Sequence, residues 1–152
     1  MYLASIVLLM LVLPAASVAI EAVVSGGSLF SLLAKWFVFW PVGVRLFVAG
    51  IRQTLQPQFT AGTIFAIRDP AAQAIVREVG FGNLSMGTLG LLSLPFPAFT
   101  FPALIVGGLY YGLAGLGHLM RGERNAHENI ALVSDLAIFV LLAAIAVVGL
   151  MA

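Results

Sequence analysis

The sequence predicts an all-α integral membrane protein, a helical bundle of about five transmembrane helices. Hydrophobic residues make up 62% of the 152 residues and charged residues 9%, whereas a soluble domain is about 45–50% apolar and about 25% charged. The apolar residues form runs whose length is close to the roughly 20 residues that a helical span requires. We expect spans at about 1–24, 37–55, 70–94, 102–120 and 126–150, within one transmembrane domain (residues 1–152) that has the lipid bilayer as its partner.

The first span is the apolar stretch that ends near Glu21. The small residues at 15–19 are typical of a signal-peptide cleavage site, so a secretory signal is the alternative interpretation. No positively charged segment precedes the stretch. We therefore expect it to remain as a permanent span, followed by the uncharged turn at 25–28.

The second apolar run, from 29 to 56, is too long for one straight span. Lys35 and Trp36, near its start, are residue types that favour the headgroup level. We therefore expect 29–36 to lie near one interface and 37–55 to make the crossing.

Capping signals indicate where the later spans begin. Residues 58–69 form the longest connection, and Asp69 followed by Pro70 is typical of a helix start. A proline-rich hairpin separates the third span from the fourth. Asn125 can cap the fifth span, and Glu128, three residues later, completes a capping box.

The basic residues are distributed unevenly between the two sides of the predicted bundle. Five of the seven lie in or near the two connections on the side of the N-terminus, and Lys35 alone lies on the opposite side. These five are Arg52, Arg68, Arg77, Arg121 and Arg124. The positive-inside rule then predicts a cytoplasmic N-terminus and an external C-terminus.

The ionisable groups inside the spans gather toward this cytoplasmic side. With about 1.5 Å of rise per residue, Arg52 and His118 lie roughly 5 Å deep, Arg77, Glu78 and Asp135 roughly 10–13 Å, and Arg45 roughly 15 Å. Charge in hydrocarbon costs roughly 2.5–3.5 kcal/mol per residue. Each group therefore needs a partner or a wet cavity.

The spacing of the polar residues predicts that they share helix faces. The stripes are Arg45 and Arg52; Glu78, Gly82 and Ser85 with Asn83 beside them; Tyr111, Gly115 and His118; and Glu128 and Asp135. We expect spans two to five to turn these stripes toward one another around a polar cavity, with the first span peripheral. Arg45 and Arg52 would pair with Glu78 and Asp135. The alternative is that such pairs only hold the bundle together.

Single residues carry narrower interpretations. A histidine such as His118 can relay a proton near neutral pH. We interpret Glu128 as a helix cap and His127 as a solvated residue at the interface. The small-residue patterns Gly108, Gly112 and Gly115, and Gly82, Gly87 and Gly90, predict close helix packing, within one bundle or in a homo-oligomer.

Residues 78–84, continuing through Gly87 and 90–93, resemble the third-helix signature of an uncharacterised bacterial family of small multi-span integral membrane proteins, broadly DoxX-like. The likeness covers about 40–150. It implies the fold and a bacterial inner (cytoplasmic) membrane, with no assigned activity. It also marks four motif positions, Glu78, His118, Asn129 and Asp135.

A weaker likeness concerns residues 121–130, which are similar to an element of the membrane-associated glutathione transferases of eicosanoid and glutathione metabolism. That element follows the first span in those proteins and the fourth span here. The likeness implies that Arg45, Arg52 and Arg124 would hold an anionic thiol peptide.

Several classes of site are not indicated. Without cysteine and with two histidines, we expect no metal site, and no motif indicates a cofactor or a catalytic residue. A net charge of +1 is too small for nucleic-acid binding. The predicted ligand-binding or cavity residues are Arg45, Arg52, Arg77, Glu78, Asn83, Tyr111, His118, Asn129 and Asp135.

The leading hypothesis is a non-enzymatic inner-membrane protein, either an accessory subunit of a larger membrane complex or a bundle that binds a small hydrophobic or anionic molecule. A small transporter or proton-coupled carrier is the first alternative. A membrane enzyme acting on a lipid-soluble, quinone-like or glutathione-type substrate is the second.

Overall fold

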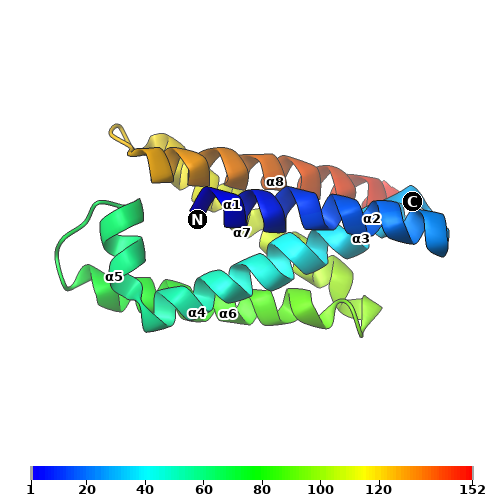
Figure 1. Ribbon diagram of the computed structural model, residues 1–152, viewed down its shortest axis with the longest axis horizontal. Coiled ribbons are helices and arrows are strands. Elements are labelled where there is room, and N and C mark those ends of the chain that lie inside the picture. Colours follow the sequence, from blue (N-terminus) through cyan, green and yellow to red (C-terminus); the bar gives the residue numbers. More distant parts are fainter. Residues whose placement is uncertain (1, 152) are drawn as a thin grey trace.

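A computed structural model describes residues 2–151; the first residue of the span expected at 1–24 and the last residue of the domain expected at 1–152 lie outside that range. The described chain is an all-α bundle, as predicted. Five helical passes run along its long axis, and the two ends of the chain lie at opposite ends of the bundle (Figure 1). The passes are Tyr2–Val24, Leu29–Leu55, Ala72–Leu92, Pro97–Met120 and Ala126–Met151.

The first two passes form an antiparallel hairpin. The first is α1 (Tyr2–Val7), the π-helical η1 (Leu8–Val12) and α2 (Leu13–Val24); the second is α3 (Leu29–Phe37), the π-helical η2 (Val38–Arg45) and α4 (Leu46–Leu55). Gly26 and Gly27 make the turn with φ of 71° and 116°, values that suit glycine. Ser28 caps α3 by accepting from the amide of Ser31 at 3.2 Å.

Polar contacts fasten this hairpin at the end far from the N-terminus. The Nζ of Lys35 lies 2.8 Å from Oε1 of Glu21, and the indole of Trp36 donates to Oε2 at 2.6 Å. One turn further on, Trp40 donates to Ser17 at 3.0 Å. The charges of Glu21 and Lys35 are therefore matched within the hairpin.

The third pass, α6 (Ala72–Leu92), packs closely along the second because glycines line its contact face. A methyl group added at Gly87 would lie 2.7 Å from Cα of Phe47, and one added at Gly90 would lie 2.6 Å from Cα of Gly43. Both distances are below ordinary van der Waals contact. Close packing was the prediction for Gly87 and Gly90, whereas Gly82 has no neighbour within 4 Å.

The connection at 58–69 is more ordered than the sequence indicates. The short α5 (Pro57–Phe59) leads into it, and it contains the π-helical η3 (Thr60–Ile64). Asp69 accepts a hydrogen bond from the amide of Ala71 at 2.9 Å. The helix begins at Ala72, two residues later than expected, because Asp69 and Pro70 form a turn before it.

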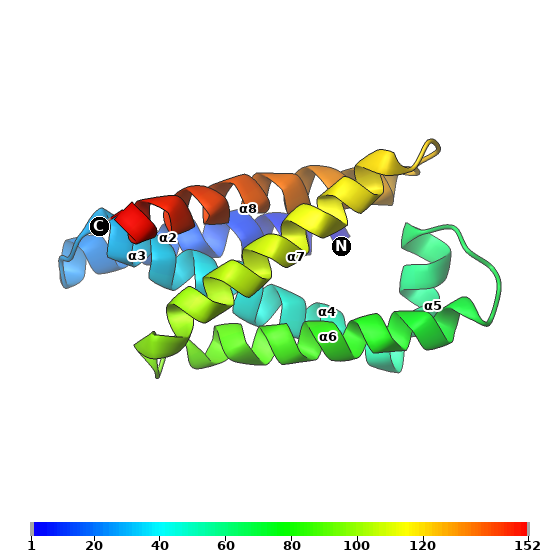
Figure 2. The ribbon, with the colours of Figure 1, turned by 180° about the vertical axis from the view of Figure 1, so that it is seen from behind.

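The last two passes are joined by a short connection. The 3₁₀-helical η4 (Pro97–Phe99) leads into α7 (Thr100–Met120), and the last pass is α8 (Ala126–Met151). Figure 2 shows that α7 begins near the end of α6 and runs obliquely across the bundle to the start of α8. Asn125 caps α8 as predicted, accepting from the amide of Glu128 at 2.9 Å.

Four of the five passes are long and apolar enough to cross a membrane, namely the first, second, fourth and fifth. The exception is α6, which has 21 residues and carries Arg77 and Glu78. Large hydrophobic side chains remain exposed along the outer faces, among them Leu11, Val23 and Val140. Such apolar surface is expected of helices in contact with lipid.

Candidate functional site

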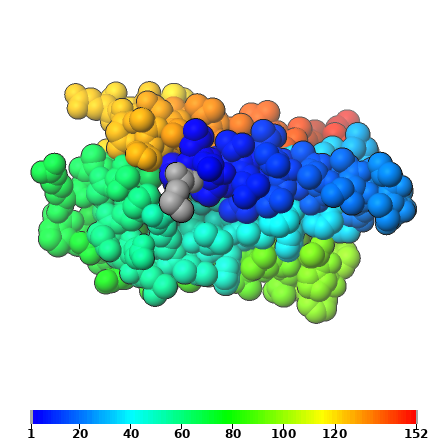
Figure 3. Space-filling model, in the orientation of Figure 1, coloured from blue at the N-terminus to red at the C-terminus, as the bar shows by residue number. Residues whose placement is uncertain are grey.

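A cavity of about 440 Å³ lies at the end of the bundle where α1 begins and α4 and α7 end. In Figure 3 the start of α1, the first turns of α8 and the segment 57–64 meet around this end. Every pass contributes to the lining, including Tyr2, Ser5 and Leu9 of the first. The expectation that the first span only packs peripherally is therefore wrong.

Six of the nine residues predicted from sequence line this cavity: Arg45, Arg52, Asn83, Tyr111, His118 and Asp135. The remaining three do not. Arg77 and Glu78 are exposed on α6, and Asn129 is exposed at the start of α8, where its Oδ1 accepts from Nε of Arg124 at 3.1 Å. A ligand-binding role for any of the nine stays a prediction.

The expected pairing of the two arginines with Glu78 and Asp135 is wrong. Within residues 2–151, the ion pairs with N···O within 4.0 Å are Lys35–Glu21, His118–Glu128 and Arg121–Glu128. Glu78 shares a helix face with Gly82 and Ser85, as predicted, but this face is exposed.

The opposite face of α6 is the buried one, because glycine allows the closest backbone approach. Its buried residues recur at the helical spacing of three to four: Val76, Gly80, Asn83, Gly87 and Gly90. Glu78 is two residues from Gly80 and so projects from the other side.

Two buried polar atoms near the cavity have no hydrogen-bond partner in the described residues. One is Nε of Arg45, and the other is Oδ1 of Asn83, whose side chain is 1% exposed. The amide of Asn83 donates to Oε1 of Gln53 at 2.6 Å, which fixes the orientation of Oδ1. Buried polar groups in native proteins are nearly always paired, so these two atoms call for a partner.

Two other lining residues, Arg52 and Tyr111, make contacts within the fold. The guanidinium of Arg52 stacks on Phe59, with Cζ 3.5 Å from the ring centre. The hydroxyl of Tyr111 donates to the carbonyl of Pro41 at 2.6 Å. Tyr111 is therefore a structural wall residue whose polar group serves the fold.

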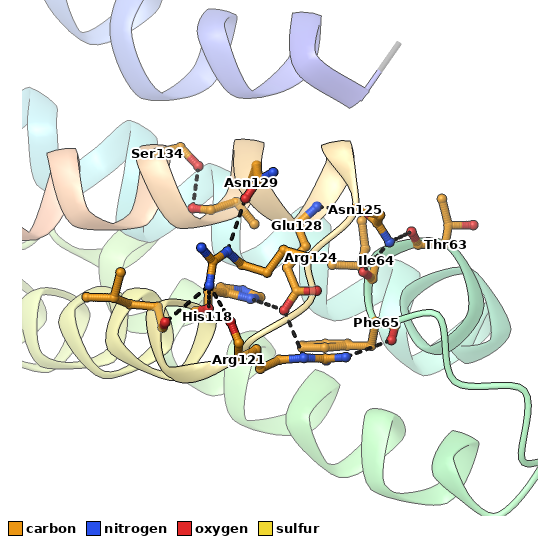
Figure 4. Close-up of polar contacts among 12 residues, drawn as sticks. Thr63, Ile64, Phe65, His118, Arg121, Arg124, Asn125, Glu128, Asn129 and Ser134 are labelled. Carbon is orange, nitrogen blue, oxygen red and sulfur yellow. Dashed lines mark hydrogen bonds and ion pairs between the residues drawn. The ribbon is translucent and has the colours of Figure 1, made fainter.

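An ionic cluster lies at the edge of the cavity (Figure 4). Nδ1 of His118 is 3.0 Å from Oε1 of Glu128, and Nε of Arg121 is 3.2 Å from the same oxygen. Glu128 is 1% exposed and His118 is 8% exposed. Within the described residues the carboxylate of Glu128 thus bonds to side chains at the end of the preceding helix and to no backbone amide, so the interpretation of Glu128 as a helix cap is wrong.

The same cluster holds the segment 57–65 across the end of the bundle. Asn125 donates to the carbonyls of Thr63 and Ile64 at 3.1 and 2.9 Å. Arg121 donates to the carbonyl of Phe65 at 3.1 Å. The Phe65 ring stacks on His118 with a centroid distance of 5.5 Å and an interplanar angle of 17°.

Arg124 completes the connection between α7 and α8. Its Nη1 donates to the carbonyls of His118 and Leu119, each at 3.1 Å, and to that of Arg121. These carbonyls lie at the end of α7, where a cation is favourable.

Sequence reasoning missed Gln53 and Phe65, and it placed Arg121 in a connection and Glu128 on the Asp135 face without predicting that these two side chains form an ion pair. One signal for Glu128 was present. The connection between α7 and α8 is so short that residues at the end of one helix must face the first turn of the next, and His118 and Glu128 are ten residues apart. Nothing in the sequence indicated that Phe65 would fold back onto His118.

The helical bundle and its apolar outer faces define a multi-pass helical membrane protein. The chain belongs to the family of unknown function DUF6790, whose model matches residues 1–152. No curated protein matches the chain, and no solved structure does.

Proposed function

We propose that this protein is a non-enzymatic membrane bundle that binds a small amphipathic molecule with an acidic head group in the end-on cavity. The observation that supports the proposal is the buried Nε of Arg45, a cavity-lining residue; this donor atom has no hydrogen-bond partner within residues 2–151. An arginine stays protonated. A bound anion would therefore both satisfy this donor and offset the charge.

The remaining lining fits the same class of molecule. Asn83 offers a buried acceptor without a partner, which suits a hydroxyl or amide on the ligand. Apolar side chains such as Leu46 and Val48 form much of the wall. The volume of about 440 Å³ falls within the roughly 300–1,000 Å³ typical of small-molecule sites.

We also propose the membrane arrangement. Five spans, with α6 as the third, in a bacterial inner membrane and with a cytoplasmic N-terminus, follow from the arginine distribution and the DoxX-like resemblance. In this arrangement the cavity opens toward the cytoplasm. A ligand could then reach it from the inner leaflet or from the cytoplasm.

The test is gentle purification followed by native mass spectrometry and extraction of bound small molecules. The wild type should carry an acidic amphiphile at a defined ratio. Arg45→Gln should lose it while keeping its size-exclusion profile and most of its thermal stability, because within residues 2–151 the side chain makes no ion pair closer than 4.0 Å. Arg68→Gln, at an exposed loop arginine, is the matched control and should keep the ligand.

Two results would contradict the proposal. One is a wild type that carries no small molecule and takes up none of a series of added fatty acids and alkyl phosphates. The other is Arg45→Gln with native ligand content. Copurification of a large protein in place of a small molecule would instead support an accessory-subunit role.

A further inference from the structure

We propose that His118 is a proton-accepting residue of the cavity, with Glu128 as its positioning residue. The inference rests on the proposed function and adds to it that the bound molecule carries a weakly acidic hydroxyl group, such as that of a phenol, quinol or carboxylic acid. Where that hydroxyl is still protonated on arrival, as in a phenol or quinol, it would give its proton to Nε2 of His118. The ligand-binding proposal requires only an anion near Arg45.

The contacts of His118 select one tautomer. Nδ1 lies 3.0 Å from a carboxylate oxygen of Glu128, and an ionised carboxylate only accepts hydrogen bonds. Nδ1 therefore carries the hydrogen, and in the neutral ring Nε2 has the free lone pair. Arg121 contacts the same oxygen at 3.2 Å, so the buried negative charge is matched.

The free nitrogen is accessible from the cavity. His118 is a lining residue. Within residues 2–151 its Nε2 makes no hydrogen bond, and this atom is not fully buried. Phe65 stacks on one ring face and fixes the ring plane. The imidazole is thus held by two contacts while its basic edge stays open.

The charges around His118 favour the products of proton transfer. Glu128 contacts the ring and would stabilise the imidazolium. Arg45 and Arg52, from the second pass, line the same cavity and would hold the oxyanion. Asp135 of α8, Tyr2 of α1, and Tyr110 and Tyr111 of α7 are the other titratable groups on its wall.

The step balances without a further reactant. The O–H bond of the ligand breaks, its electron pair stays on oxygen, and an N–H bond forms at Nε2. The ligand is then an anion and the imidazole a cation. Reversal returns the proton when the ligand leaves, so nothing is consumed.

The experiment uses an alkyl-substituted 4-nitrophenol, whose anion absorbs visible light and so reports its own ionisation. Protein in nanodiscs would be titrated with this probe at a fixed pH slightly below the value at which the free probe is half ionised. With wild type, the bound probe should be several-fold more ionised than the probe in empty nanodiscs. His127→Gln, which changes the chain's other histidine, should behave as wild type.

His118→Gln should still bind the probe saturably but lose most of the extra ionisation, and Glu128→Gln should give an intermediate loss. Full ionisation with His118→Gln would overturn the inference while leaving the binding proposal standing. No saturable binding by wild type would overturn the binding proposal and, with it, this inference. The two failures are therefore distinct.

A second measurement needs no substitution within this buried cluster. Nitrogen-15 spectra of histidine-labelled His127→Gln report His118 alone, because the chain has two histidines. We expect a protonated Nδ1 and an unprotonated Nε2. The opposite tautomer would overturn the inference.

Discussion

The hydroxyl of Tyr111 donates a 2.6 Å hydrogen bond to the backbone carbonyl of Pro41, joining two passes across 70 residues of sequence. Tyr111 is 2% exposed and Pro41 lies inside the π-helical η2. The bond therefore fixes α7 against the one irregular stretch of the second pass, directly beside the cavity.

Removing this hydroxyl should destabilise the bundle. Tyr111→Phe keeps the ring and leaves the carbonyl of Pro41 without its donor, at a cost of about 1 kcal/mol. Unfolding in mixed micelles with increasing SDS measures the change. Tyr110→Phe is the control, because it removes the neighbouring hydroxyl and keeps the bond from Tyr111 to Pro41. Equal effects of the two substitutions would contradict the assignment.

The glycine contact between α6 and η2 should tolerate no side chain. A methyl group at Gly90 would lie 2.6 Å from Cα of Gly43 and 2.9 Å from the carbonyl carbon of Val42. Because these are backbone atoms, the helices must separate, and we expect a loss of roughly 1–3 kcal/mol. Gly82→Ala, on the same helix with nothing within 4 Å, should be neutral or slightly stabilising. The same unfolding assay compares them.

The segment 57–65 should loosen when Asn125 is truncated. Asn125→Ala removes the cap of α8 and the two bonds to the carbonyls of Thr63 and Ile64. Each of the two bonds to this segment contributes about 1 kcal/mol, which is roughly a fivefold change in its opening equilibrium. Amide hydrogen exchange over 57–65 should rise at least that much. Asn129→Ala, which loses only its contact with Arg124, should leave this segment protected.

The number of spans can be decided by reporters inserted at two places. If α6 crosses the membrane, the connection at 65–71 and the one at 93–99 lie on opposite sides. The connection at 65–71 would then lie in the cytoplasm, on the same side as the N-terminus. If α6 lies outside the bilayer, both reporters should give the same signal. That result would reduce the count to the four long apolar passes.

Much of the architecture follows from local rules. The apolar runs predict the passes. Asn125 is predicted as a cap because it stands three residues before a glutamate, and its side-chain oxygen can accept from a free backbone N–H at the start of the helix. The clustering of ionisable groups at one end follows from their positions along the helices. These features depend on sequence-local chemistry, so a sequence suffices to find them.

The orientation of each helix about its own axis does not follow in the same way. On α6, one stripe contains Glu78 and Ser85 and the other contains Gly80, Asn83 and Gly87. Treating charge as the inward signal selects the wrong stripe, because the helix packs by backbone proximity. The observed site differs from the predicted one for the same reason. Glu128 satisfies a capping pattern, and only the packing of α7 against α8 shows its carboxylate bonding to His118.

The contact between Glu21 and Lys35 bears on how the chain enters a membrane. Each charge alone would oppose insertion of its own helix, whereas the two together, 14 residues apart in sequence and 2.8 Å apart in the fold, largely cancel that penalty. The first two helices should therefore enter the bilayer as one helical hairpin during synthesis. Lys35→Glu should delay or prevent that entry, even though neither residue lies near the cavity.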